Sequence, residues 1–394
     1  MRTLGRLGVD AYGVHDTPRA PAAWSRYSKG KFVYRQGDDP RSFLREVAHS
    51  IGRRALLIAQ DDVSTLVIDE HADDLREWFL FPDQPRGLPH TLANKREMAK
   101  LCGRLHIPTP EVVFPASGDE VIAFAERRGV PVVIKGVESW VPGTGIAARP
   151  VIAHTREQLL AEWNAMTHAE RANTMLQEYI PGGADSVWMF NGYFNEASEC
   201  LLSFTGRKLH QSPPYSGVTS LGICLENDVV GDTTKRLAKE VGYRGVIDIG
   251  YRYDERDGLY KLLDVNPRVG ATFRLFVDRE TGIDVVRALY LDLTGQPVPP
   301  GRTPVGRKWL LDPWDVKSCV AYRRDGRLTL PEWARAYRGV DELAWLAKDD
   351  PLPFLAVAGR VLAKRFRRAV VRFACLSWAG VPASLAPSLV ALSN

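Results

Sequence analysis

Residues 246–268 read VIDIGYRYDERDGLYKLLDVNPR. Within this stretch, residues 246–253 and 259–265 are largely apolar runs with the length of β-strands, and the polar residues 254–258 separate them. A turn-forming segment between two such runs predicts an antiparallel β-hairpin. The polar residues on this hairpin give the first indication of chemistry.

The predicted hairpin brings two carboxylates together. If residues 254–258 form a five-residue loop, Asp248 lies opposite Asp264. Asn266 then shares a face with Asp264, because side chains alternate between the two faces of a strand. Directly opposed carboxylates about 5 Å apart repel each other, so we expect a cation between them. Two carboxylates and an amide oxygen favour Mg²⁺ that keeps some positions for phosphate, with Mn²⁺ as an alternative. The other interpretation is a solvated hairpin face with ordinary charges.

The residues that follow favour the metal site. Pro267 and Arg268 come directly after Asn266 and place a cation just beyond the carboxylates. Such a cation is suited to neutralising a phosphoryl group during its transfer.

The composition is that of a globular protein. The chain has 394 residues, of which 45% are hydrophobic and 25% charged, so disorder and a disulfide scaffold are not expected. The five cysteines are odd in number and form no C-x-x-C pair, which favours a reducing, cytoplasmic location and argues against a cysteine-based zinc site. The eight histidines show no metal-ligand spacing, and His210, the nearest to the hairpin motifs, is not expected to act as a base.

The net charge of +5 comes from the end of the chain. Residues 351–394 contain six basic residues and no acidic ones, which leaves 46 basic against 47 acidic residues elsewhere. The body is therefore not expected to bind nucleic acid.

The run LLDVNPR at residues 262–268 resembles the E-x-N-P-R signature of the ATP-grasp superfamily, with Asp264 in place of the usual Glu. Its carboxylate–amine ligase branch, which includes D-alanine–D-alanine and D-aspartate ligases, is the most similar. The resemblance extends from a linker at residues 82–89 to about Thr294. It implies an α/β (α+β) protein in which two α+β lobes form the ATP-grasp fold, after a parallel α/β pre-ATP-grasp domain and before a C-terminal extension.

The resemblance assigns the phosphate and metal sites. Lys95 and Lys135 match the two phosphate-binding lysines, although Lys95 alone would be interpreted as a solvated helix residue. The loop at residues 138–147, with Gly143 and Gly145, corresponds to the lid over the triphosphate. Asp248, Asp264 and Asn266 match the metal ligands, in agreement with the hairpin argument.

The resemblance also assigns the nucleoside and catalytic positions. Glu178 and Ile180 belong to the interlobe strand that reads adenine, and Asp185 matches the ribose-binding carboxylate. Taken alone, Asp185 would be interpreted as a turn residue. The implied catalytic residues are Arg268, Lys208 and Arg207.

The implied reaction joins a small-molecule carboxylate to an amine at the expense of ATP, through an acyl phosphate. The alternatives are ATP-grasp chemistry on a thiol, on bicarbonate or in phosphate transfer, and a catalytically silent ATP-binding scaffold. Asp61 and Asp62 follow the predicted strand at residues 55–59 and are expected to cap the next helix rather than to grip an amine. The substrates and the oligomeric state are not encoded in any motif.

We expect four regions: residues 1–88 (pre-ATP-grasp domain), 89–298 (ATP-grasp domain), 299–350 (C-terminal extension) and 351–394 (a basic tail). In the first region the expected strands are 11–15, 31–35 and 55–59, and the expected helices are 41–50 and 63–75. Residues 1–7 look like the end of a helix, which suggests a missing first strand and a start upstream of Met1. Asn191-Gly192 predicts a hairpin turn.

The tail has the pattern of a basic amphipathic helix. Leu355, Leu362 and Phe366 fall on one side of a helix over residues 353–376, and Arg360 and Lys364 fall on the other. One interpretation is peripheral contact with an anionic membrane at its cytoplasmic face. The other is that the apolar stripe packs on the body of the protein.

Overall fold

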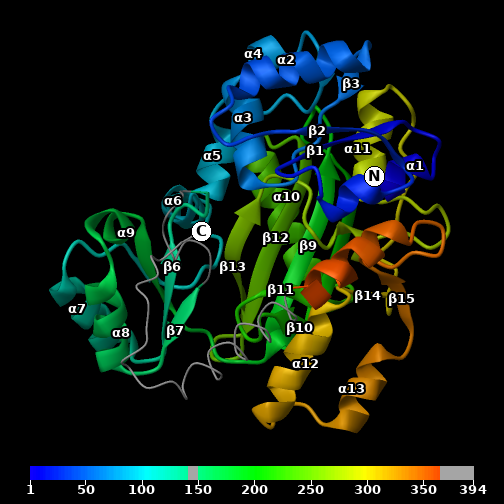
Figure 1. The fold of residues 1–394 in the computed structure, drawn as a ribbon. Helices are drawn as coiled ribbons and strands as arrows, with labels where there is room; N and C mark the ends of the chain where they lie inside the picture. Colours follow the sequence, from blue (N-terminus) through cyan, green and yellow to red (C-terminus); the bar gives the residue numbers. More distant parts are fainter. Residues whose placement is uncertain (141–149, 364–394) are drawn as a thin grey trace, which may run out of the picture.

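The N-terminal region is built from short parallel strand pairs and helices. A computed structural model describes residues 1–140 and 150–363 (Figure 1). Strand β1 (Ala11–His15) pairs in parallel with β2 (Ser28–Val33), and β3 (Ala55–Leu56) pairs in parallel with β4 (Phe79–Leu80). The parallel pairing agrees with the prediction, but the strands form two separate two-stranded sheets. The helical elements of this region are α1 (Arg2–Gly5), η1 (Pro21–Trp24), α2 (Pro40–Ile51), α3 (Asp62–Glu70) and α4 (Ala72–Leu75).

A small lobe follows the connecting helices α5 (Leu88–Ala93) and α6 (Lys95–Arg104). Asn94 caps α6 as predicted, since its side chain accepts hydrogen bonds from the backbone of Arg96 and Glu97. The lobe has a four-stranded sheet in the order β5 (Val112–Val113), β8 (Thr174–Glu178), β6 (Val132–Gly136), β7 (Val151–Ala153). Helices α7 (Gly118–Arg128), α8 (Arg156–Ala165) and α9 (His168–Ala172) accompany this sheet.

The large lobe contains a seven-stranded sheet in the order β13-β12-β9-β10-β11-β14-β15. The strands are β9 (Val187–Phe194), β10 (Cys200–Ser212), β11 (Val218–Cys224), β12 (Gly245–Asp254), β13 (Leu259–Asn266), β14 (Lys308–Leu310) and β15 (Val340–Leu343). The helical elements are η2 (Ala184–Ser186), α10 (Asp228–Glu240), η3 (Phe273–Leu275), α11 (Val285–Leu293), α12 (Trp314–Arg324) and α13 (Leu330–Tyr337). The expected C-terminal extension therefore adds two strands to this sheet.

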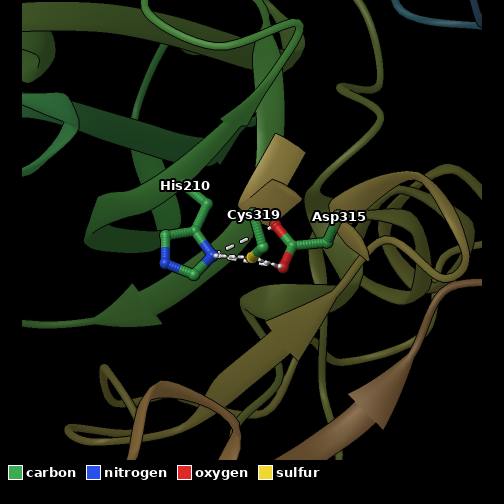
Figure 2. Close-up of side chains that lie close together, drawn as sticks. All are labelled: His210, Asp315 and Cys319. Carbon is green, nitrogen blue, oxygen red and sulfur yellow. Dashed lines mark hydrogen bonds and ion pairs between the residues drawn. The ribbon is translucent and has the colours of Figure 1, made fainter. Parts of the chain in front are cut away.

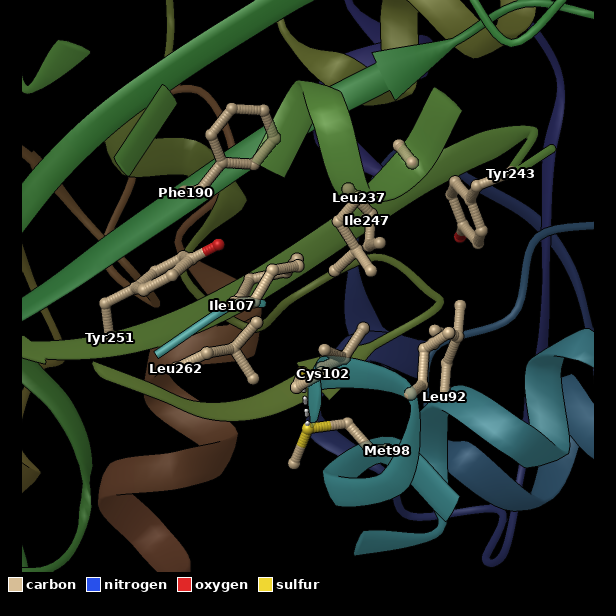
Figure 3. Close-up of a cluster of buried hydrophobic side chains, with 14 of the residues drawn as sticks. Leu92, Met98, Cys102, Ile107, Phe190, Leu237, Tyr243, Ile247, Tyr251 and Leu262 are labelled. Atoms are coloured by element: carbon tan, nitrogen blue, oxygen red, sulfur yellow. Dashed lines mark hydrogen bonds between the residues drawn. The ribbon is translucent and has the colours of Figure 1, made fainter. Parts of the chain in front are cut away.

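One face of the β12–β13 hairpin is buried against helices α5, α6 and α10. Figure 3 shows Ile247, Tyr251 and Leu262 packed in this cluster with Leu92 and Leu237 from the helices. Because this face is apolar and buried, the alternate residues of the hairpin face the other way. The hairpin thus presents its carboxylates away from the core.

The predicted register of this hairpin is wrong. Asp254 pairs with Leu259, so the loop is one residue shorter than expected, and a bulge lies between Gly250 and Tyr251. Asp248 therefore opposes Asn266, and Asp264 opposes Gly250. The carboxylates are diagonal rather than directly opposed, but they share one face.

The predicted turn at Asn191-Gly192 is also wrong. Strand β9 runs through both residues, and the chain reverses at residues 195–199, where Asn195 Oδ1 accepts from the backbone of Ala197 and Glu199. Because β9 is hydrogen-bonded along its length to β10 on one side and β12 on the other, this pairing outweighs the local preference of Asn-Gly.

The two ends of the described chain meet. Asp350, which is 1% exposed, accepts hydrogen bonds from Arg2 Nε at 2.8 Å and Ser25 Oγ at 2.7 Å. A helix then runs from residue 352 to the last described residue, 363. Most of the predicted tail helix lies outside the described residues. Among the described residues, no helix combines the length and the apolar character that crossing a membrane requires.

Candidate active site

A cavity of about 630 Å³ lies between the two lobes and receives side chains from both. The small lobe contributes Lys135 and Gln177, helix α6 contributes Lys95, and β10 contributes Lys208. The β12–β13 hairpin and the residues just after it contribute Asp248, Asp264, Asn266 and Arg268. Most of the residues singled out for phosphate and metal binding are thus brought to one place.

Positive charge is in excess in this cavity. Its lining includes five cationic side chains (Lys95, Lys135, Lys208, Arg252 and Arg268) and three acidic ones (Asp62, Asp248 and Asp264). Burial lowers the pKa of all three lysines, that of Lys135 to about 8, while the charge of Asp264 acts in the opposite direction. Burial and mutual repulsion disfavour the charged forms of these lysines. A bound polyanion would offset both effects, so the cavity is suited to binding one.

Two glycines leave room for the two carboxylates of the hairpin. A Cβ at Gly270 would lie 2.5 Å from Cγ of Asp248, and a Cβ at Gly250 would lie 2.8 Å from Oδ1 of Asp264. Burial, and then the charge of Asp264, raise the pKa of Asp248 to about 6. A cation bound at the pair would favour the ionised form of both carboxylates and so offset the raised pKa of Asp248.

The donor set fits a hard divalent cation in most respects. Next to Asp248 in the sheet register lies Asn191, which is fully buried and whose side-chain atoms have no hydrogen-bond partner among the described residues. Asn266 currently donates to Asp264 Oδ2 at 3.2 Å and accepts from Arg268 Nη2 at 3.1 Å. The Asn266 oxygen can therefore bind a metal only if it shares or releases Arg268.

Arg268 is anchored by the N-terminal region. Its Nε donates to Asp62 Oδ1 at 2.7 Å, and Asp62 Oδ2 accepts from Ser139 Oγ at 2.7 Å. Asp61 caps α3 as expected, because its side chain accepts from the backbone of Ser64. Asp62, in contrast to the expectation, lines the cavity. Because Asp61 and Asp62 both follow the predicted strand, the sequence could not show which of them caps the helix and which lines the cavity.

The nucleoside residues are only partly gathered in the cavity. Ile180 lines it. Glu178 does not line the cavity, because its carboxylate pairs with Arg256 at 2.7 Å, and its backbone N–H donates to the carbonyl of Glu111 at 2.8 Å. Asp185 is exposed in η2 and is not among the lining residues. Gly143 and Gly145 lie outside the described residues.

Arg207 is not brought to the site. Its guanidinium lies 6.0 Å from the ring centroid of Trp188, whereas the adjacent Lys208 lines the cavity. Neighbouring residues on a strand point to opposite faces, so Arg207 and Lys208 could not both reach the same phosphate. The prediction that Arg207 belongs to the catalytic residues is therefore not supported by its position.

Several lining residues were not predicted. Gln177 Oε1 accepts from Lys135 Nζ at 3.0 Å, and Arg252 donates to the carbonyl of Gly182. Gln177 directly precedes Glu178, and Arg252 lies four residues after Asp248 on β12. Because side chains alternate between the two faces of a strand, the positions of Glu178 and Asp248 could have pointed to Gln177 and Arg252.

A second, smaller cavity of about 80 Å³ adjoins the first and shares Arg268 with it. It lies between the N-terminal region and the large lobe, and much of its lining is apolar, including Leu57, Ile68 and Phe81. Arg268 thus lines both cavities.

Several solved structures have a fold similar to that of this chain. The ADP complex of N5-carboxyaminoimidazole ribonucleotide synthetase matches with a TM-score of 0.58 at 13% identity, over 78% of this chain and 76% of that chain. The biotin carboxylase domain of Hydrogenobacter thermophilus 2-oxoglutarate carboxylase, in complex with MgADP, matches with a TM-score of 0.56 at 15% identity, over 78% and 69%. The chain has the ATP-grasp fold.

Sequence comparison agrees with the ATP-grasp fold. The D-aspartate ligase of Enterococcus faecium (strain Aus0004) is 25% identical over 228 residues, which are 55% of this chain and 54% of that protein. The carbamoyl phosphate synthase large chain of Acidobacterium capsulatum is 22% identical over 52% of this chain and 18% of its own length. No known family profile matches the chain. The chain therefore spans about half of the D-aspartate ligase and less of the synthase.

Proposed function

We propose that this ATP-grasp protein is an ATP-dependent ligase that joins a carboxylate to an amine through an acyl phosphate. The observation that carries the proposal is the convergence of three lysines and Arg268 on a pair of carboxylates in one interlobe cavity. The similarity to a D-aspartate ligase supports the same reaction class. Phosphoryl transfer needs mainly positioning and charge stabilisation, which such a cavity supplies.

The proposed reaction has two steps. An oxygen of the substrate carboxylate attacks the γ-phosphorus of ATP, and ADP leaves. The amine then attacks the acyl carbon, loses a proton and expels phosphate, so that an amide forms. Lys95 and Lys135 hold the α- and β-phosphates, while Arg268 and Lys208 neutralise the transferring group. The first step needs no general base, because a carboxylate is already a nucleophile.

Asp248 and Asp264, together with the Asn266 oxygen, would hold Mg²⁺ or Mn²⁺. Bound there, the ion supplies charge neutralisation to the phosphate oxygens. The backbone at Glu178 and Ile180 would read adenine, Asp185 would bind the ribose after a local movement, and the loop with Gly143 and Gly145 would cover the triphosphate.

The test is ADP release by the full chain with Mg²⁺ and ATP, in mixtures of amino-acid carboxylates and amines. We expect the double variant Asp264→Asn, Asn266→Ala to lose at least about 100-fold in rate. Asp257→Asn, on the same hairpin but at its turn, is the control and should retain activity. ADP release that survives the double change would contradict the assignment.

The same assay separates the alternatives. Stimulation by bicarbonate or a thiol, but by no amine, would indicate a different acceptor. ADP that stays at the background of the protein alone with every acceptor would indicate a nucleotide-binding scaffold.

We also propose that one substrate carries a small apolar group. The chamber beside Arg268 is small and is also lined by Asp69 and Arg76, but Leu57, Ile68 and Phe81 form an apolar part of its wall that favours a short alkyl group. A substrate series that lengthens an alkyl side chain should pass through a minimum in KM, and Ile68→Trp should shift that minimum to shorter chains. A KM independent of the side chain would remove this proposal.

Finally, we propose that the C-terminal tail makes peripheral contact with an anionic membrane. In the described start of its helix, Leu355 and Leu362 are 58% and 63% exposed, whereas Val357 is 2% exposed and faces the body. The predicted apolar stripe therefore does not pack on the body over this part. An exposed apolar stripe next to basic residues is typical of helices that lie in a membrane surface.

A further inference from the structure

A second cluster of chemically active side chains lies outside the cavity. Figure 2 shows His210, Asp315 and Cys319 pointing toward one another. His210 comes from strand β10, and the other two residues are one turn apart on helix α12. All three are buried, with exposed fractions of 6%, 1% and 0%. The proposed ligase chemistry uses none of them.

The distances in this cluster are those between ligands of one small ion. His210 Nδ1 lies 3.1 Å from Asp315 Oδ2 and 3.5 Å from Cys319 Sγ, and Sγ lies 3.2 Å from the same carboxylate oxygen. Zinc bonds of about 2.0–2.3 Å in a tetrahedron place neighbouring ligand atoms about 3.3–3.6 Å apart. A small inward or outward adjustment of each side chain would accommodate the ion.

The surroundings orient the carboxylate. Ser220 Oγ donates to Asp315 Oδ1 at 2.5 Å, and the Tyr337 hydroxyl donates to Oδ2 at 2.8 Å. Metal-binding residues are commonly fixed in this way by hydrogen bonds from the next layer of side chains. These two hydroxyls are also the nearest candidates for a fourth ligand.

We propose that His210, Asp315 and Cys319 bind a zinc ion that fastens helix α12 to strand β10. One nitrogen, one sulfur and one oxygen donor suit Zn²⁺ and not Mg²⁺, so this site is chemically distinct from the carboxylate pair at Asp248 and Asp264. The ion would hold in place the strand that carries Lys208 into the cavity. The sequence contains no zinc motif, because His210 is separated along the chain by 105 residues from Asp315 and by 109 residues from Cys319.

The competing explanation is a metal-free hydrogen-bond network in which the thiol stays protonated. In that network Cys319 Sγ donates to Asp315 Oδ2 at 3.2 Å, whereas a bound zinc ion would be held by the thiolate. Bound metal and a bond from that metal to sulfur therefore distinguish the two explanations.

The first experiment measures metal in the full chain purified under reducing conditions and dialysed against a weak chelator. We expect about one zinc per chain by mass spectrometry of the metal. After exchange with Co²⁺, a sulfur-to-cobalt charge-transfer absorption should appear in the near ultraviolet, which a Mg²⁺-type oxygen site cannot produce. Absence of zinc together with absence of this absorption after Co²⁺ addition would overturn the proposal, whatever the outcome of the ligase assay.

The second experiment uses variants. Cys319→Ser and His210→Ala should each weaken zinc affinity at least about tenfold. Cys102→Ser is the matched control, because Cys102 is equally buried but lies in the core around α6. Zinc should raise the unfolding midpoint of the wild type and of this control, and not that of the two ligand variants. Equal zinc content in all four proteins would also overturn the proposal.

Discussion

Gly270 illustrates how a missing side chain leaves room for the carboxylate of Asp248. Gly270→Ala would drive a Cβ into the Asp248 carboxylate and displace it. We expect ADP release to fall by about 10- to 100-fold, because catalytic groups tolerate little misplacement. The matched control is Gly103→Ala in helix α6, where a Cβ meets no atom within 4 Å. That control should keep full activity and gain a few tenths of a kcal/mol in stability; similar losses in both variants would argue against this role for Gly270.

Asp254, at the turn end of the β12–β13 hairpin, makes stability depend on pH. The carboxylate is fully buried and accepts from Lys261 Nζ at 2.6 Å and Arg256 Nε at 2.8 Å. Hydrogen bonds from Arg256 and Lys261 hold the pKa of Asp254 below its usual range, so its stabilisation is complete above about pH 4 and is lost as the pH falls further.

Asp254→Ala should therefore lower the free energy of unfolding by about 3 kcal/mol at pH 7. Urea unfolding at several pH values should show the difference from wild type narrowing below pH 4. A difference that stays constant from pH 7 to pH 3 would show that packing, and not ionisation, is lost.

At the scale of an element, two neighbouring residues at the start of helix α3 are expected to have different roles, one in stability and one in activity. Asp61 caps the helix, while its neighbour Asp62 reaches Arg268 in the cavity. We expect Asp61→Ala to cost about 1 kcal/mol of stability with activity retained. Asp62→Ala should leave the unfolding midpoint nearly unchanged and reduce kcat/KM, since Arg268 loses its anchor. Calorimetry and the ADP assay on both variants check this; parallel effects of the two changes on both readouts would contradict it.

At the scale of the whole molecule, deletion of the C-terminal tail tests the proposed contact with an anionic membrane. Deleting residues 364–394 keeps every described contact of the body. We expect the full chain to co-sediment with vesicles that contain anionic phosphatidylserine, and to be released by high salt because the attraction is electrostatic. The truncated chain should stay in the supernatant with its ADP release intact. Equal partitioning of both proteins would leave the tail without a membrane role.

The local chemistry of the sequence determined the elements that carry the site. The alternation of Asp264 and Asn266, the cap at Asn94 and the parallel strands of the N-terminal region could all be read from neighbouring residues, because periodicity and capping act over a few positions. The ATP-grasp architecture was implied by the resemblance of residues 262–268 to the signature of that superfamily. These features need no knowledge of distant contacts.

Only the tertiary structure decided the features that depend on distant partners. Asn191-Gly192 became the middle of a strand because β9 is paired on both sides, and the hairpin register differs from the predicted one because the loop is one residue shorter and a bulge shifts the pairing by one more residue. Arg207 was excluded from the cavity by the face of its strand, and Asp62 was brought into it by the packing of α3 against the large lobe. His210, Asp315 and Cys319 meet only after β10 and α12 pack together, since no spacing along the chain encodes contacts between separate elements.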